Sequence, residues 1–143
     1  MAFQWLQMRI DEERERRERE AAVLAVLPNA LDGLHSRLKE CVDAYRSAFG
    51  SEVADIRFFA GKIRVTTREQ GNGKWEPASK VEITAVTTLP GFKIERDAVE
   101  PMMVEIGLLP GNKLFYRGDG QFLTEEELTR RILDRALFPK LRE

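Results

Sequence analysis

The sequence contains one histidine, His35, and one cysteine, Cys41, two residue types that often act as base and nucleophile. Such a pair catalyses covalent chemistry when the base lies within hydrogen-bonding reach of the thiol. Both residues fall in a segment with helical periodicity, where their separation corresponds to about 240° of rotation. Because the side chains should lie on different faces, a dyad is poor geometry. We expect His35 to pack or face solvent, and Cys41 to be a small hydrophobic residue of the core.

Metal and phosphate sites have no complete motif in this sequence. One cysteine and one histidine cannot supply the tetrahedral ligand set of a structural zinc ion. Residues 117–127, RGDGQFLTEEE, lack the alternate-position acids of a calcium loop. Residues 70–77, QGNGKWEP, look like a turn-rich loop, and residues 69–76 lack the GK[ST] ending of a phosphate loop. We therefore expect no metal and no cofactor, assign no catalytic residue, and favour a non-enzymatic protein.

A mildly basic stretch with aromatic side chains covers residues 55–80. Cationic strands that carry aromatics such as Phe59 and Trp75 can bind single-stranded nucleic acid. The whole chain, however, has a formal net charge of -1, and no RRM-like aromatic motif is present. We expect an ordinary solvated sheet face here and no nucleic-acid partner.

Length and composition suit one domain with an appended element. The chain has 143 residues, 43% hydrophobic and 33% charged, which is enough apolar content for a core. The longest nearly apolar run, residues 21–31, is too short to span a bilayer and contains Pro28. The first residues lack the basic region and long apolar run of a signal peptide. A single cysteine permits no internal disulfide, so we expect a cytoplasmic setting.

From residue 53 onward, apolar and polar residues alternate, which predicts β-strands. The inner face should carry Ile63, Val65, Thr67, Val81, Ile83, Ala85, Met102, Val104, Ile106 and Leu108. Short connections exclude parallel crossovers and predict an antiparallel meander. Thr124 and Glu127 have the spacing of a capping box, which predicts a short C-terminal helix.

An apolar seam with steps of three and four precedes the strands and predicts a long helix. The seam consists of Leu24, Leu27, Leu31, Leu34, Leu38, Cys41, Tyr45 and Ala48. Pro28 lacks a backbone N–H, so we expect a kink or break there, with helix over about 3–26 and 30–49. The predicted fold is α+β: a long N-terminal helix kinked or broken near Pro28, an antiparallel meander of about five to six strands, and a short C-terminal helix.

The most unusual stretch is RIDEERERRERE, residues 9–20, in which eleven of twelve residues are charged. Three Glu residues precede Arg by four positions: Glu12 and Arg16, Glu13 and Arg17, Glu15 and Arg19. Each such pair stabilises a helix by about 0.2–0.5 kcal/mol. The stretch therefore favours a solvated helical spacer.

Apolar residues flank this spacer at both ends. They are Phe3, Trp5, Leu6, Met8 and Ile10 on one side, and the run that contains Leu24 and Leu27 on the other. Residues 30–49 are long enough to cover the sheet, so residues 1–27 are surplus and would expose apolar surface, which usually marks a contact. We predict two parts: residues 1–27, a protruding helix for self-association, dimeric in preference, through the seven apolar residues just named; and residues 28–143, a single α+β domain.

An alternative function is binding of a small or lipid-like ligand, or catalysis, in a pocket between the helices and a curved sheet. The candidate lining residues are Tyr45, Phe49, Met102, Val104 and Ile106.

Overall fold

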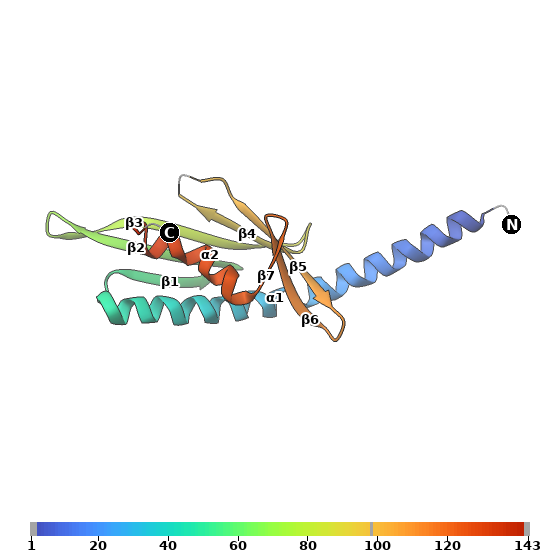
Figure 1. The fold of residues 1–143 in the computed structure, drawn as a ribbon, viewed down its shortest axis with the longest axis horizontal. Helices are drawn as coiled ribbons and strands as arrows, with labels where there is room; N and C mark the ends of the chain where they lie inside the picture. The colour runs from blue at the N-terminus through green and yellow to red at the C-terminus, as the bar shows by residue number, and fades with distance from the viewer. Residues whose placement is uncertain (1–2, 98, 142–143) are drawn as a thin grey trace.

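The computed structural model describes residues 3–97 and 99–141, and its fold is α+β. Helix α1 comes first, strands β1 to β7 follow, and helix α2 comes last (Figure 1). Their bounds are α1 Gln4–Phe49, β1 Ala54–Phe59, β2 Lys62–Gly71, β3 Lys74–Val86, β4 Gly91–Arg96, β5 Met102–Leu109, β6 Lys113–Gly118, β7 Gln121–Leu123 and α2 Glu125–Leu137. The strands form one antiparallel sheet in sequence order. The predicted fold class is confirmed, with seven strands among the described residues rather than five to six.

Two of the sequence-based strand boundaries were wrong for the same physical reason. A two-residue hairpin turn of type I′ needs positive φ at both central positions, and Asn72 and Gly73 have φ of 54° and 78°. Gly71 therefore pairs directly with Lys74, and most of the expected loop at 70–77 is strand. The same turn type at positions 119 and 120 lets the next residues pair as β7, which sequence analysis missed.

The core lies between one face of the sheet and the two helices. Cross-strand neighbours of this face meet directly, as Ile63 does with Ile83 and Ile83 with Ile94. The inner-face prediction is confirmed, because every named residue is buried except Ala85 and Leu108, which are half-buried. Helix α2 adds an apolar stripe that begins at Leu128 and ends at Leu137.

The capping box at the start of α2 is confirmed. The backbone N–H of Glu127 donates to the Thr124 hydroxyl over 3.1 Å, and the Thr124 N–H donates to the Glu127 carboxylate over 3.4 Å. Both interactions satisfy N–H groups that a helix start otherwise leaves unpaired. The cap therefore fixes where the chain turns from β7 into the helix that covers the sheet.

Helix α1 continues through Pro28 without a break. Figure 1 shows that its first part is inclined to its second part, so the helix is bent. A proline in a helix interior removes one hydrogen bond and its ring clashes with the preceding turn, which explains a bend. Of the two predicted possibilities, a kink rather than a break is found.

The face that α1 buries drifts away from the predicted seam. Its buried residues are Val23, Leu27, Ala30, Leu31, Leu34, Leu38 and Val42. Val42 is buried whereas Cys41 is exposed, so the prediction of Cys41 as a core residue was wrong. Ala48 is exposed as well. The reason is that a helix has 3.6 residues per turn, so a seam of period 3.5 rotates by about 20° every heptad.

Candidate interaction surfaces

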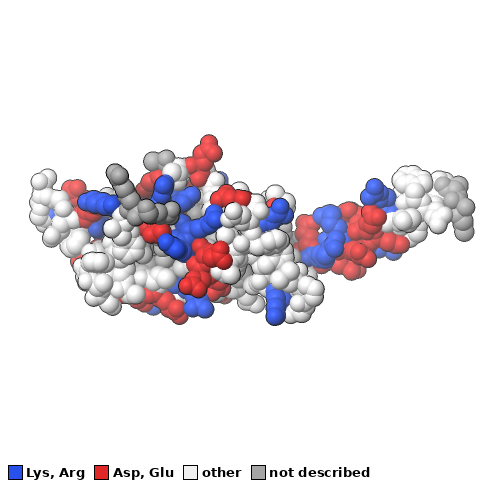
Figure 2. All heavy atoms as spheres, viewed as in Figure 1, with Lys and Arg blue, Asp and Glu red and all other residues white. Residues whose placement is uncertain are grey.

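The first part of α1 projects beyond the sheet as a free helix (Figure 1). No residue from Phe3 to Ala22 is buried, and the first buried residue of the helix is Val23. Figure 2 shows a band of mixed charge on this projection, followed by an uncharged end. We call residues 9–20 the rod, and we call the five apolar residues Phe3, Trp5, Leu6, Met8 and Ile10 the tip.

Ion pairs along the rod hold its helical form. The carboxylate of Glu13 lies 2.8 Å from a guanidinium nitrogen of Arg16 and 3.1 Å from one of Arg17. Hydrogen bonds from Arg16 and then Arg17 lower the pKa of Glu13 to about 2. Of the three predicted pairs, Glu13 with Arg17 is confirmed, Glu12 pairs with Arg9 instead of Arg16, and Glu15 forms no ion pair with Arg19. All these groups are solvent-exposed, so each pair stabilises the helix only slightly.

The tip is apolar on most sides of the helix. Phe3, Trp5 and Met8 leave 70%, 65% and 59% of their surface exposed. Leu6 and Ile10 are exposed too. Phe3, Leu6 and Ile10 share one face by their spacing, and Trp5 and Met8 lie on the opposite side of the helix. A helix that is hydrophobic nearly all round is normally buried. The exposed surface of the tip is therefore typical of a segment that a binding partner covers.

The opposite end of the rod has a different role. Leu27 is only 4% exposed and belongs to the core, and Leu24 is half-buried against it. The domain itself therefore uses most of the apolar surface of these two predicted interface residues. At this end of the rod, the accessible surface lies between α1 and the neighbouring turns of the sheet.

A hollow of about 910 Å³ lies at this base of the rod. We call it the base hollow. Its helix side is formed by Arg16, Arg19, Glu20, Ala22 and Val23, and its other side by residues 88–90, by residues 106–112 and by Phe115. Leu89 and Leu109, in or beside these turns, are 64% and 48% exposed. The base hollow thus combines charged side chains next to the rod with apolar side chains next to the sheet.

A glycine shapes the floor of the base hollow. The Phe115 ring lies over Gly107, its pairing partner on β5, and a Cβ atom there would be 2.1 Å from Cζ of the ring. Only glycine leaves this space free. Sequence analysis missed both residues, although a glycine between two apolar strand residues is a recognised signal for close approach.

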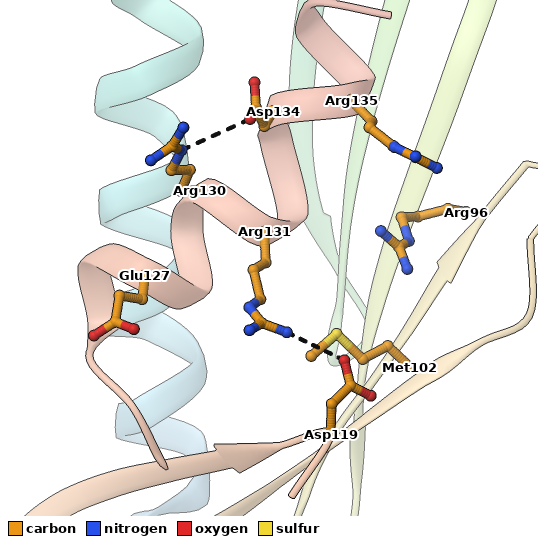
Figure 3. Close-up of a pocket in the computed structure, with 8 residues that line it drawn as sticks. All are labelled: Arg96, Met102, Asp119, Glu127, Arg130, Arg131, Asp134 and Arg135. Atoms are coloured by element: carbon orange, nitrogen blue, oxygen red, sulfur yellow. Dashed lines mark hydrogen bonds and ion pairs between the residues drawn. The ribbon is translucent and has the colours of Figure 1, made fainter. Parts of the chain in front are cut away.

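A second hollow, of about 440 Å³, is lined with arginines between α2 and the sheet. Figure 3 shows two of them engaged: Arg131 lies 3.1 Å from Asp119, and Arg130 lies 3.7 Å from Asp134. Arg96 of β4 and Arg135 of α2 point into the same space (Figure 3). Asp119 and Asp134 thus pair with two of the four guanidinium groups of this hollow, and the Arg131–Asp119 pair joins α2 to the turn between β6 and β7.

An apolar groove of about 600 Å³ runs between the second part of α1 and α2. Tyr45 and Phe49 line it, with ring centroids 5.0 Å apart, and Phe138 packs edge-on against Tyr45 at 5.5 Å. The other candidate pocket residues, Met102, Val104 and Ile106, are buried on β5 in the core. The structure therefore does not bring the five together. The missed lining residues Leu133, Leu137 and Phe138 belong to the apolar stripe of α2 or follow it directly.

His35 and Cys41, the candidate base and nucleophile, are not paired with each other. His35 packs edge-on against Phe58 at 4.8 Å between ring centroids, as a packing residue does. Partial burial raises the pKa of the Cys41 thiol, which is the opposite of activation.

Across residues 3–97 and 99–141, no three His, Cys, Asp or Glu residues are grouped to hold a metal ion. Over the same residues, no helix is long and apolar enough to cross a membrane.

Searches of protein-family models, of curated proteins and of solved structures found no match to this chain. The functional conclusion therefore rests on the geometry of the surfaces just described.

Proposed function

We propose that this chain is a non-enzymatic protein-interaction domain that forms a homodimer through the first part of α1. The observation that carries the proposal is the exposed tip at the end of a 46-residue helix. Trp is the residue type found most often as an interface anchor, and Trp5 is one of the five residues of the tip. A single cysteine is compatible with a reducing cytoplasm, which we include in the proposal.

Charge balance favours a protein partner over a lipid surface. Membrane-surface helices carry Lys and Arg on their polar face without matching acids. The rod has six acids at positions 11, 12, 13, 15, 18 and 20, against five arginines at 9, 14, 16, 17 and 19. Anionic lipid therefore gains little from this segment, whereas a second copy can match both signs.

Sedimentation equilibrium on the full chain tests the proposal. The double substitution Trp5→Ala and Leu6→Ala should weaken dimerisation by about 2–4 kcal/mol, the range of interface hot spots. Trp75→Ala is the matched control, because Trp75 is 40% exposed on β3 and belongs neither to the tip nor to the lining of the base hollow.

A wild-type chain that stays monomeric at micromolar concentration would refute self-association. Vesicle co-sedimentation provides the second test, and the protein should not pellet with anionic vesicles. Strong pelleting that the double substitution abolishes would identify a membrane as the partner instead.

A second candidate function is binding of a small apolar ligand in the groove between α1 and α2. The observation in its favour is the set of aromatic rings around this groove, namely Tyr45, Phe49 and Phe138. The test uses the chain with the tip substitutions, so that the tip cannot bind the probe. 8-Anilinonaphthalene-1-sulfonate should bind saturably, and Ala48→Glu, which places a charge in the groove, should abolish binding. Binding that is absent, or unchanged by Ala48→Glu, excludes this function.

A further inference from the structure

We propose that two copies pair their rods antiparallel, so that the tip of each copy fills the base hollow of the other. This inference rests on the proposed function and specifies its geometry. The occupant of the base hollow is thus a defined segment of a second copy of this chain. The evidence is the order of charges along the rod, the distances along the helix, and the composition of the two surfaces.

The charge order of the rod is complementary to itself when one copy is read in reverse. About a centre between residues 14 and 15, Glu12 corresponds to Arg17 and Glu13 to Arg16, whereas Asp11 corresponds to Glu18. In a parallel pair in register, acids would face acids and arginines would face arginines, which is destabilising. In an antiparallel pair about this centre, Glu12 and Glu13 of each copy face Arg17 and Arg16 of the other, so most of the facing charges are opposite.

Helix geometry then determines what lies opposite the tip. The centre of the antiparallel pair falls near residues 14 and 15, nine residues from both Trp5 and Val23–Leu24. At 1.5 Å per residue, this separation is about 14 Å in either direction. Trp5 and Leu6 of one copy therefore lie level with Val23 and Leu24 of the other. Val23 lines the base hollow. The alignment that pairs the charges of the two rods therefore also places the tip of one copy at the base hollow of the other.

The two surfaces match in chemistry as well. The tip presents aromatic and aliphatic side chains on most of its circumference. The base hollow offers Leu89, Leu109 and Phe115 on the side away from the helix. Buried aromatic side chains remove about 150–250 Å² each from water. Because the pair is two-fold symmetric, the contact forms twice and closes, so it yields a dimer rather than a fibre.

Cross-linking tests the arrangement directly on the full chain. Cys41→Ser removes the only native thiol, and Met8→Cys and Leu109→Cys then place single thiols on the tip and at the end of β5, in the lining of the base hollow. The two variants carry tags of different size and are mixed before a short bismaleimide is added. The expected product joins one Met8→Cys chain to one Leu109→Cys chain. A product that joins two Met8→Cys chains indicates parallel rods and would overturn the inference.

Charge reversal gives an independent measurement with a matched control. Replacing residues 11–13 by Arg, or Arg16, Arg17 and Arg19 by Glu, should each weaken dimerisation about 100-fold, because like charges then face each other. The chain with both sets reversed has the wild-type net charge and restores antiparallel complementarity. It should dimerise within about tenfold of the wild type, and circular dichroism should show that its rod is still helical.

The outcomes separate the inference from the proposed function. A monomeric wild type refutes both. A wild-type dimer that the single-set reversals leave unchanged refutes the antiparallel arrangement alone, and self-association through the tip then stands. Failure of the chain with both sets reversed to recover, while its helix content is normal, also overturns the antiparallel arrangement.

Discussion

The two parts of α1 belong to one continuous helix but have opposite surroundings. Residues 4–22 face water on all sides and are stabilised by ion pairs between exposed side chains. Residues 23–49 lie against the sheet and α2, with Leu34, Leu38 and Val42 fully buried. Helical periodicity alone does not separate the parts. The comparison shows that an apolar stretch of this helix joins the core only where the sheet and α2 lie opposite it.

The energetics of the two parts should differ accordingly. Burial of apolar surface contributes roughly 25 cal/mol per Å², so each buried leucine of the second part matters greatly for folding. Exposed ion pairs contribute between zero and about 1 kcal/mol. The first part should therefore have little influence on the stability of the monomer, and its apolar residues should act only when a partner covers them.

The largest contrast is expected between Leu34→Ala and Leu6→Ala. Leu34 is fully buried in the core cluster, and its truncation should reduce the free energy of unfolding by about 2–5 kcal/mol through lost burial and a cavity. Leu6 is 41% exposed, so the same change should alter monomer stability by about 0.5 kcal/mol or less. Urea denaturation of both variants, at a protein concentration below the dimer dissociation constant, measures the difference. Equal losses would mean that the first part of α1 packs against the domain.

Pro28→Ala examines the junction between the parts. Pro28 is exposed, so the change leaves no cavity, and the new N–H can donate to the carbonyl of Leu24. We expect a gain of about 1–3 kcal/mol in unfolding free energy, because proline is about 3 kcal/mol worse than alanine in a helix interior. Thermal unfolding followed by circular dichroism measures this gain. A loss of stability would show that the bend is needed to seat the second part on the sheet.

The smallest effect concerns the pH response of the rod. The pKa of Glu13 is about 2 in the folded chain, against an ordinary value of 4.5. Because the folded pKa is depressed, the stabilisation from this group is complete above pH 4.5 and disappears as the pH falls toward 2. The difference in helix content between the wild type and Glu13→Gln, followed by circular dichroism, should be constant from pH 7 to 5 and then shrink. A difference that changes only near neutral pH would contradict this assignment.

Local sequence signals predicted local structure well. The Thr124 capping box and the alternation around Ile63 and Val81 depend on residues within a few positions of each other, and both were confirmed. The boundary residues were harder to predict. Whether Cys41 or Val42 is buried depends on the rotation accumulated along two heptads and on where the sheet lies. Likewise, an Asn72-Gly73 turn was mistaken for a longer loop, since the residues around it are polar.

Some candidate surfaces likewise follow from a single segment of the sequence, whereas others depend on how distant segments meet. The sequence by itself determined the tip, the rod and its charge order, because these lie within the first twenty residues and need no other segment. Only the tertiary structure decided that Leu27 belongs to the core, and that residues 88–90 and 106–112 come together beside the rod as the base hollow. A helix face follows from spacing along one segment. A hollow requires knowing how distant turns meet, which the register of the whole antiparallel sheet determines.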